Sequence, residues 1–326
     1  QWQLDYNPQA QATTVEDSAT PQPAKPAASP PVDDVPEIGK LESGNAVEAP
    51  PLAEATPPTS QPILVTTDVL RVEIDPRGGS LVSAELLAYP QQQGSSEPVR
   101  LLDDEAARYF VAQSGLLSSD GAAPNHQAEF TTSSRNWTLA NGQNRIEVPL
   151  TWQDASGIQV RKTLVFERGS YVIGMQQQVR NASAKPWTGQ AYRQLQRIPL
   201  VLDSSGIKGY TNTERYSFMG AAWYSPEEKF QKLAFDKFQG EPLKQTVSGG
   251  WVAMLQHYFF AAWIPPASEV DEFSSAQVAA ADGTRYVMRS FSPALSIQPG
   301  TEQTFSARLY VGPKLQSTLD DLAPGL

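Results

Sequence analysis

The side chains best suited to acid–base chemistry lie in the C-terminal third of the chain. His257 interrupts the apolar stretch 251–263 and is followed by the carboxylates of Glu269 and Asp271. A sugar epimerase or mutarotase needs a histidine acid and a carboxylate base facing one cleft, and these residues could supply them. A lone histidine in an apolar strand is more often held by structural hydrogen bonds, so we expect a structural role for His257. His126 follows a Gly-Ala-Ala-Pro-Asn loop and is expected at the surface.

Paired carboxylates are a second possible source of chemistry. Four acidic doublets occur, at Asp103-Asp104, Glu227-Glu228, Asp271-Glu272 and Asp320-Asp321. Two carboxylates about 5–10 Å apart across a cleft could hydrolyse a glycosidic bond. Neighbouring residues on a strand point to opposite faces, however, so a doublet is not itself such a pair. We expect these acids to be solvated turn charges.

Aromatic residues mixed with charge mark the segment 210–248. A protein-contact surface commonly combines aromatic anchors with a charged rim. We therefore predict a partner-binding surface here, with an ordinary hairpin as the alternative. Its members would be Trp223, Tyr224, Glu227, Glu228, Lys229 and Phe230. In contrast, the stretch 251–263 is apolar on both faces, as in a strand buried on both sides, and is predicted to be core rather than a stacking platform for ligands.

Several classes of function are excluded by composition. The chain has 326 residues, no Cys, two His and a formal net charge of −10. The absence of Cys excludes disulfide scaffolds, zinc fingers, iron–sulfur sites and thiol catalysis. The acidic balance argues against a polybasic nucleic-acid or lipid surface. Phosphate-binding glycine loops and His-Glu-x-x-His are also missing, so we expect no cofactor, no metal and no catalytic residue.

The elements that position these residues are predicted to be strands. Apolar residues alternate with polar ones in segments such as 70–75, 146–152, 158–166 and 305–311. Turn residues recur about every ten positions, as antiparallel sheets require. About fifteen such segments would overtwist one sheet, so two sheets packed face to face are favoured. The predicted fold is an all-β, two-sheet antiparallel β-sandwich formed by residues 63–326 as one domain.

A short helix is predicted at the C-terminus, over about 314–322. Leu315, Leu319 and Leu322 follow the i, i+4, i+7 spacing of one apolar stripe, and Pro324-Gly325 would end it. The stripe would pack on the sandwich itself or dock against a membrane part outside this chain.

The first 62 residues differ in composition from the rest. They hold 12 of the 27 prolines and nine acids against two lysines, a net charge of −7. Such a segment buries too little apolar surface to offset the entropy of ordering it. We predict a disordered, extended tether that acts as a spacer, with a plain disordered terminus as the alternative; Trp2 and Tyr6 at its start could mark the end of a membrane-spanning helix.

Three groups of residues carry a resemblance to a known family. They are Thr67-Asp68-Val69-Leu70 with Arg77-Gly78-Gly79; Gly220-Ala221-Ala222 with Glu228-Lys229-Phe230; and Gly249-Gly250-Trp251-Val252-Ala253-Met254-Leu255-Gln256 with Ala262-Trp263-Ile264-Pro265. Together they resemble the large first periplasmic domain of the YidC family of membrane protein insertases of Gram-negative bacteria. The resemblance covers residues 63 to about 322, and the Gly-Gly-Trp block is its most specific part. It implies that residues 1–62 are the end of the first transmembrane helix and the periplasmic linker that follows it.

The resemblance implies a large β-sandwich (a supersandwich of mutarotase-like shape) with a short C-terminal helix. It implies a non-catalytic periplasmic domain of a multi-pass inner-membrane protein that helps insert and fold nascent inner-membrane proteins. Through its parent protein it would meet the Sec translocon, and the region corresponding to 210–248 would contact the accessory complex SecDF. The insertase groove itself would lie outside this chain.

Two other functions remain open at the level of sequence. One is a carbohydrate-binding or mutarotase-like β-sandwich, which would require titratable groups that converge in a cleft. The other is a peptide-holding chaperone surface, which would require an exposed apolar groove.

Overall fold

The computed structural model describes residues 35–36, 61–91, 94–119, 121–199, 218–280, 283–315, 319 and 322–326. Most of the tether predicted over 1–62 therefore lies outside the described residues, and the tether remains a prediction. In the described part of the chain, no helix combines the length and apolar character that a membrane crossing requires.

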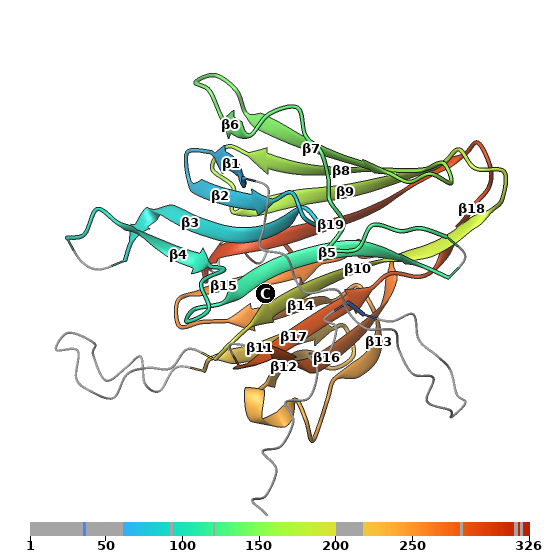
Figure 1. The fold of residues 1–326 in the computed structure, drawn as a ribbon. Coiled ribbons are helices and arrows are strands. Elements are labelled where there is room, and N and C mark those ends of the chain that lie inside the picture. Colours follow the sequence, from blue (N-terminus) through green and yellow to red (C-terminus); the bar gives the residue numbers. More distant parts are fainter. Residues whose placement is uncertain are drawn as a thin grey trace, which may run out of the picture. The chain divides into compact units, whose positions relative to one another are not determined.

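The described residues form two β-sheets, which lie as layers in Figure 1. The larger sheet has 11 strands in these residues, with the order β13-β16-β17-β10-β5-β3-β2-β1-β6; β18 pairs with β10 and β4 with β3. Its strands are β1 (Ile63–Thr66), β2 (Leu70–Asp75), β3 (Ser80–Pro90), β4 (Pro98–Leu102), β5 (Phe110–Ser118), β6 (Asn136–Thr138), β10 (Trp187–Arg197), β13 (Lys244–Ser248), β16 (Val270–Ala280), β17 (Gly283–Phe291) and β18 (Leu295–Ile297).

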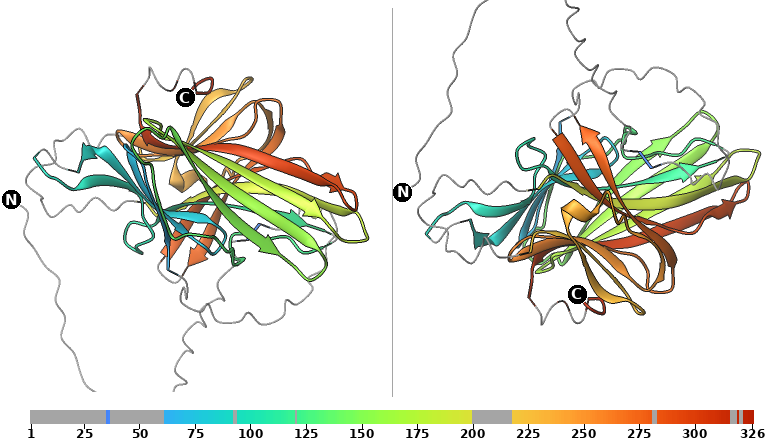
Figure 2. Two further views of the ribbon diagram at one scale, coloured as in Figure 1. Left: turned by 90° about the horizontal axis from the view of Figure 1, so that it is seen from above. Right: turned by 90° about the horizontal axis from the view of Figure 1, so that it is seen from below.

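The second sheet has eight strands in the described residues, in the order β12-β11-β14-β15-β19-β9-β8-β7. They are β7 (Arg145–Gln153), β8 (Ile158–Glu167), β9 (Val172–Asn181), β11 (Gly220–Ser225), β12 (Lys229–Leu233), β14 (Trp251–Leu255), β15 (Phe259–Ile264) and β19 (Glu302–Pro313). A short 3-10 helix, η2 (Phe235–Lys237), follows β12. Figure 2 shows the same layers from two further sides. The predicted all-β sandwich of two sheets is confirmed.

The core lies between the sheets because the alternating strands turn their apolar sides inward. Val148, Leu150, Leu164 and Phe166 are all nearly inaccessible to water. A β-bulge between Glu73 and Ile74 shifts the register of β2 against β3. Leu81 is buried as a result, whereas sequence alternation alone would place Val82 inside.

The strands of the stretch 251–263 are core, as predicted, whereas Tyr258 in the turn between them is 61% exposed. The two strands, β14 and β15, pair with each other near the middle of the eight-stranded sheet. Trp263 joins the cluster between the sheets, while Trp251 joins a second apolar cluster on the outer face of the same sheet. The strands are apolar on both sides because both of their faces are covered.

The backbone geometry requires glycine in two of the sequence blocks described above, Arg77-Gly78-Gly79 and Gly249-Gly250-Trp251. Gly78 has φ of +75°, and a Cβ there would lie 2.3 Å from the carbonyl oxygen of His126. A Cβ on Gly250 would lie 2.2 Å from the carbonyl oxygen of Tyr224. Both positions bring backbone against backbone, which only glycine allows.

Candidate functional site

The proposed acid–base pair is not assembled. His257 lies in the turn before β15, while Glu269 and Asp271 follow the far end of that strand. Six extended residues span about 20 Å, so the imidazole and the carboxylates lie at opposite ends of β15. No general acid and base can act on one substrate across that distance.

Glu269 and Asp271 instead bind a buried arginine. Arg193 on β10 donates to Asp271 at 2.8 Å and to Glu269 at 2.9 Å, and its second amino group also donates to the carbonyl of Ser306 at 2.9 Å. Arg193 is 0% exposed and Asp271 1% exposed. Since Ser306 lies on β19, the guanidinium joins the two sheets. These acids therefore have a structural task.

A buried lysine forms a second link between the sheets. Lys162 on β8 is 0% exposed, and its Nζ donates to the carbonyls of Gly78 at 2.6 Å and Ser114 at 2.9 Å, and to the Ser114 hydroxyl at 3.0 Å. All three acceptors are uncharged. Burial lowers the pKa of Lys162 to about 7 because nothing anionic offsets the lost hydration.

The burial of Lys162 has a signal in the sequence. Lys162 occupies the inward phase of β8, between Val160 and Leu164, so strict alternation already places it in the core. Arg193 offers no such signal, because every residue from Ala191 to Arg197 on β10 is buried regardless of phase.

The expectation that His126 lies at the surface is wrong. His126 is 4% exposed, and its Nδ1 lies 2.6 Å from the Tyr192 hydroxyl. The loop that carries His126 packs against Gly78, and the amide of Gly78 donates to the carbonyl of Ala128 in that loop. A loop composition predicts the turn correctly but does not predict that the loop is tucked against the sheet.

The predicted partner-binding residues lie on one hairpin, but two of its aromatics are inside. Trp223 and Tyr224 on β11 are each 8% exposed, so the expectation that they are exposed anchors is wrong. Because neighbouring side chains of a strand point to opposite faces, Trp223 lies in the core between the sheets and Tyr224 lies in the outer apolar cluster. Tyr224 stacks on Trp251 at 6.0 Å between ring centroids.

The turn of the same hairpin is exposed. Glu227, Glu228 and Lys229 are open to solvent, and Phe230 is 41% exposed. Lys229 has φ of +60°, an uncommon conformation for a non-glycine residue, and its ammonium group donates to the carbonyl of Pro226 at 2.6 Å. We call Glu227, Glu228, Lys229 and Phe230 the hairpin tip. Residues 210–217 of the predicted surface lie outside the described residues.

An apolar pocket of about 430 Å³ lies beside the hairpin tip, on the outer face of the eight-stranded sheet. Trp251, Leu255 and Phe260 line it from β14 and β15. The remaining lining residues are Phe218, Phe230, Lys232, Lys314, Leu319 and Leu326. Apolar side chains dominate, and the two lysines supply all the charge among the lining residues.

The C-terminal segment covers part of the same face. Leu319 is 5% exposed and belongs to the outer apolar cluster, Leu322 packs against that cluster, and Leu315 is 44% exposed. The amide of Leu319 donates to Leu315 and that of Ala323 to Leu319, both with helical i to i−4 spacing. Residues 316–318, 320 and 321 of the predicted helix lie outside the described residues. Docking of this stripe against a membrane part remains a prediction.

Trp251 fastens this segment to the sheet. Its indole Nε1 donates to the carbonyl of Pro324 at 3.0 Å. We expect Trp251→Phe to keep the apolar contact and lose the hydrogen bond, at a cost of about 0.5–1.5 kcal/mol. Hydrogen exchange at the amides of Leu322 and Ala323 should accelerate, while exchange in β8 stays unchanged. Unchanged protection at these two amides would contradict the assignment.

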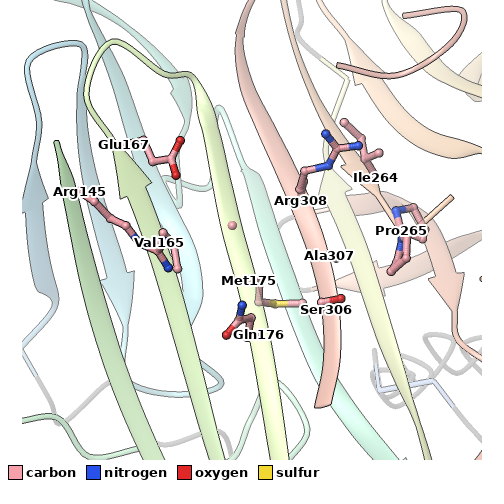
Figure 3. A pocket seen from close by; sticks show the side chains of 12 residues that line it. Arg145, Val165, Glu167, Met175, Gln176, Ile264, Pro265, Ser306, Ala307 and Arg308 are labelled. Atoms are coloured by element: carbon pink, nitrogen blue, oxygen red, sulfur yellow. The ribbon is translucent and has the colours of Figure 1, made fainter. Parts of the chain in front are cut away.

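A second, polar groove of about 330 Å³ lies on the same sheet, over β8, β9 and β19. Figure 3 shows Arg145 and Glu167 on one side of it and Arg308 on the other, with Gln176 between them. Glu167 is its one carboxylate among the described lining residues. The groove therefore lacks the two acids that glycoside hydrolysis uses.

No group of three or more His, Asp or Glu side chains in the described ranges could hold a metal ion. The buried cations Lys162 and Arg193 are instead bound within the structure, whereas the hairpin tip and the apolar pocket are open to other molecules. These two features point to contact with other molecules rather than to catalysis.

Comparison of the sequence with known proteins identifies a family. The sequence profile of the YidC periplasmic domain matches residues 62–326. The membrane protein insertase YidC of Methylococcus capsulatus is 39% identical over all of this chain, and that of Thioalkalivibrio sulfidiphilus 37%. The chain covers 56% and 57% of those proteins, so it spans about half the length of the curated relatives it matches.

Solved structures give a more distant likeness. A galactose mutarotase related enzyme from Lactobacillus acidophilus is 10% identical, with a TM-score of 0.46 over 78% of this chain and 100% of that one. A galactose mutarotase-like protein from Lactobacillus casei has the same identity and TM-score over 77% of this chain.

The family match extends over the whole sandwich and includes the hairpin tip and the Gly-Gly-Trp strand. It confirms the resemblance drawn from the sequence, and with it the periplasmic location and the prediction that the domain is not an enzyme. The chain therefore belongs to the YidC periplasmic domain family, whose members are parts of membrane protein insertases.

Proposed function

We propose that this domain acts as a periplasmic contact module of its insertase, which assists the insertion and folding of inner-membrane proteins. Its partner in this role is the SecDF accessory complex of the Sec translocon, and the contact surface is the hairpin tip. The parent protein, rather than this domain, holds nascent membrane proteins in the membrane.

The observation that supports the proposal most strongly is the exposure of Phe230. A phenylalanine that is 41% exposed, next to Glu227, Glu228 and Lys229, combines an apolar anchor with a charged rim. The backbone beneath it is fixed, because Phe230 pairs with Tyr224 across the hairpin and its ring lies 5.8 Å from that of Trp251. A partner would meet a preorganised surface and would lose little entropy in ordering it.

The test uses the full-length insertase with Phe230→Ala combined with Glu228→Lys. Both residues are exposed, so folding should be retained while co-purification of SecDF falls about tenfold, the effect of losing one interface anchor. Leu295→Ala is the matched control, because Leu295 is also an exposed apolar residue at 37% but lies on β18. Wild-type recovery of SecDF with the folded double variant would contradict the assignment of the hairpin tip.

A further inference from the structure

The apolar pocket beside the hairpin tip has an unbalanced charge at its rim. The side chains of Lys232 and Lys314 both line the pocket, and neither forms an ion pair in the part of the chain that the structure describes. Lys232 lies over the ring of Phe218 at 5.1 Å. Lys314 donates to the carbonyls of Gln256 and His257, at 2.5 and 3.0 Å. Two ammonium groups thus border an apolar hollow, and no carboxylate side chain is among its described lining residues.

Lys232 is close enough to Lys314 to disfavour the charge on Lys314. Burial lowers the pKa of Lys314, and the positive charge of Lys232 lowers it further. An anion placed between them would relieve this repulsion and receive two charge-assisted hydrogen bonds. The rim therefore favours an anionic group.

The floor of the pocket favours hydrocarbon over an extended peptide. Trp251, Leu255 and Phe260 belong to β14 and β15, which are interior strands of the sheet and use their backbone groups for pairing. An extended peptide lying on this face would find no backbone partners and would leave its own amides unsatisfied. An acyl chain has no such requirement, and a volume of about 430 Å³ lies within the range of small-ligand pockets.

We propose that this pocket binds one acyl chain of an anionic lysophospholipid, with the headgroup held between Lys232 and Lys314. The tail lies against Trp251 and Phe260 on the outer face of the sheet. Phe230 belongs both to the hairpin tip and to the wall of this pocket, but the two lysines that select the headgroup are not part of the hairpin tip.

The test is calorimetric titration of the chain with lauroyl-lysophosphatidylglycerol, and with lauroyl-lysophosphatidylcholine as the zwitterionic match, both below their micelle concentrations. The anionic lipid should bind with one-to-one stoichiometry and about tenfold more tightly. Lys232→Gln with Lys314→Gln should remove that preference but retain weak binding of both lipids. Leu255→Trp, which fills the pocket, should reduce binding of both.

Lys185→Gln serves as the matched control, because Lys185 is an exposed lysine in the loop between β9 and β10. It should bind like the wild type. Equal affinity for the two lipids, an unchanged preference in the double lysine variant, or the absence of saturable binding would each overturn the proposal. So would displacement of the lipid by an acidic amphipathic peptide that binds more tightly, since the site would then be a peptide groove. Co-purification of SecDF by the double lysine variant should remain at the wild-type level, which separates this test from that of the hairpin tip.

Discussion

Unfolding of the wild-type domain should require more free energy as the pH rises from 7 to 10, and Lys162→Met should abolish most of this gain. The folded pKa of Lys162 is lowered to about 7, whereas an exposed lysine in the unfolded chain has a pKa near 10.4. Between these values the unfolded chain binds a proton that the folded chain does not. Stability therefore increases with pH, by about 1.4 kcal/mol per unit, or roughly 4 kcal/mol over three units.

Urea unfolding followed by tryptophan fluorescence at each pH measures this difference. Methionine keeps most of the length of the side chain but cannot titrate, so the wild type and the variant should diverge progressively above pH 7. Below pH 7 both folded and unfolded forms carry the ammonium, and the two curves should run in parallel. Other titrating groups are common to both proteins and cancel in the difference. A wild-type slope identical to that of Lys162→Met would show that the amine keeps its ordinary pKa; Lys185→Met, at an exposed position, should retain the wild-type slope.

Removal of the other inter-sheet cation should have an effect of similar size. We expect Arg193→Met to lower the free energy of unfolding by about 3–5 kcal/mol, because Asp271 would remain buried without its counter-charge. Glu269 would suffer less, since 18% of its side chain already reaches water. Chemical denaturation at neutral pH gives the value directly.

A double-mutant cycle separates the ion pair from simple loss of packing. Asp271→Asn in the Arg193→Met background removes the unpaired carboxylate, so the double variant should be more stable than the sum of the two single changes predicts. Strict additivity would mean that the guanidinium and the carboxylate do not depend on each other. Arg71→Met offers a contrast, because Arg71 pairs with Glu85 on the surface at 2.8 Å and should cost less than about 1 kcal/mol.

The period of apolar residues predicted the strands and the two layers well, because burial on one face leaves a direct trace in the sequence. Ile146, Val148 and Leu150 show this trace and are all inside. The β-bulge at Glu73 and Ile74 could not be predicted in this way, since an extra residue shifts the register of the strands without a change in the type of residues.

The polar interior was harder to predict for a different reason. Lys162 and Arg193 are satisfied by carbonyls and acids from strands far away in sequence, and a one-dimensional pattern does not show which acceptors meet which donors. The same limit explains Trp223 and Tyr224. Nearby charges make the segment look like surface, but β11 pairs with β12 and β14, and both of its faces are covered.

The position of β19 governs when the domain can fold. This strand, Glu302–Pro313, is close to the C-terminal end of the sandwich, yet it lies between β9 and β15 within the eight-stranded sheet. During synthesis from the N-terminus, β9 and β15 each therefore have an unpaired edge until β19 has been made. Pairings so distant in sequence form slowly, and unpaired edges invite association with other strands. The domain is thus obliged to fold after its synthesis rather than during it, and any truncation before residue 302 should yield an aggregating fragment in place of a smaller folded one.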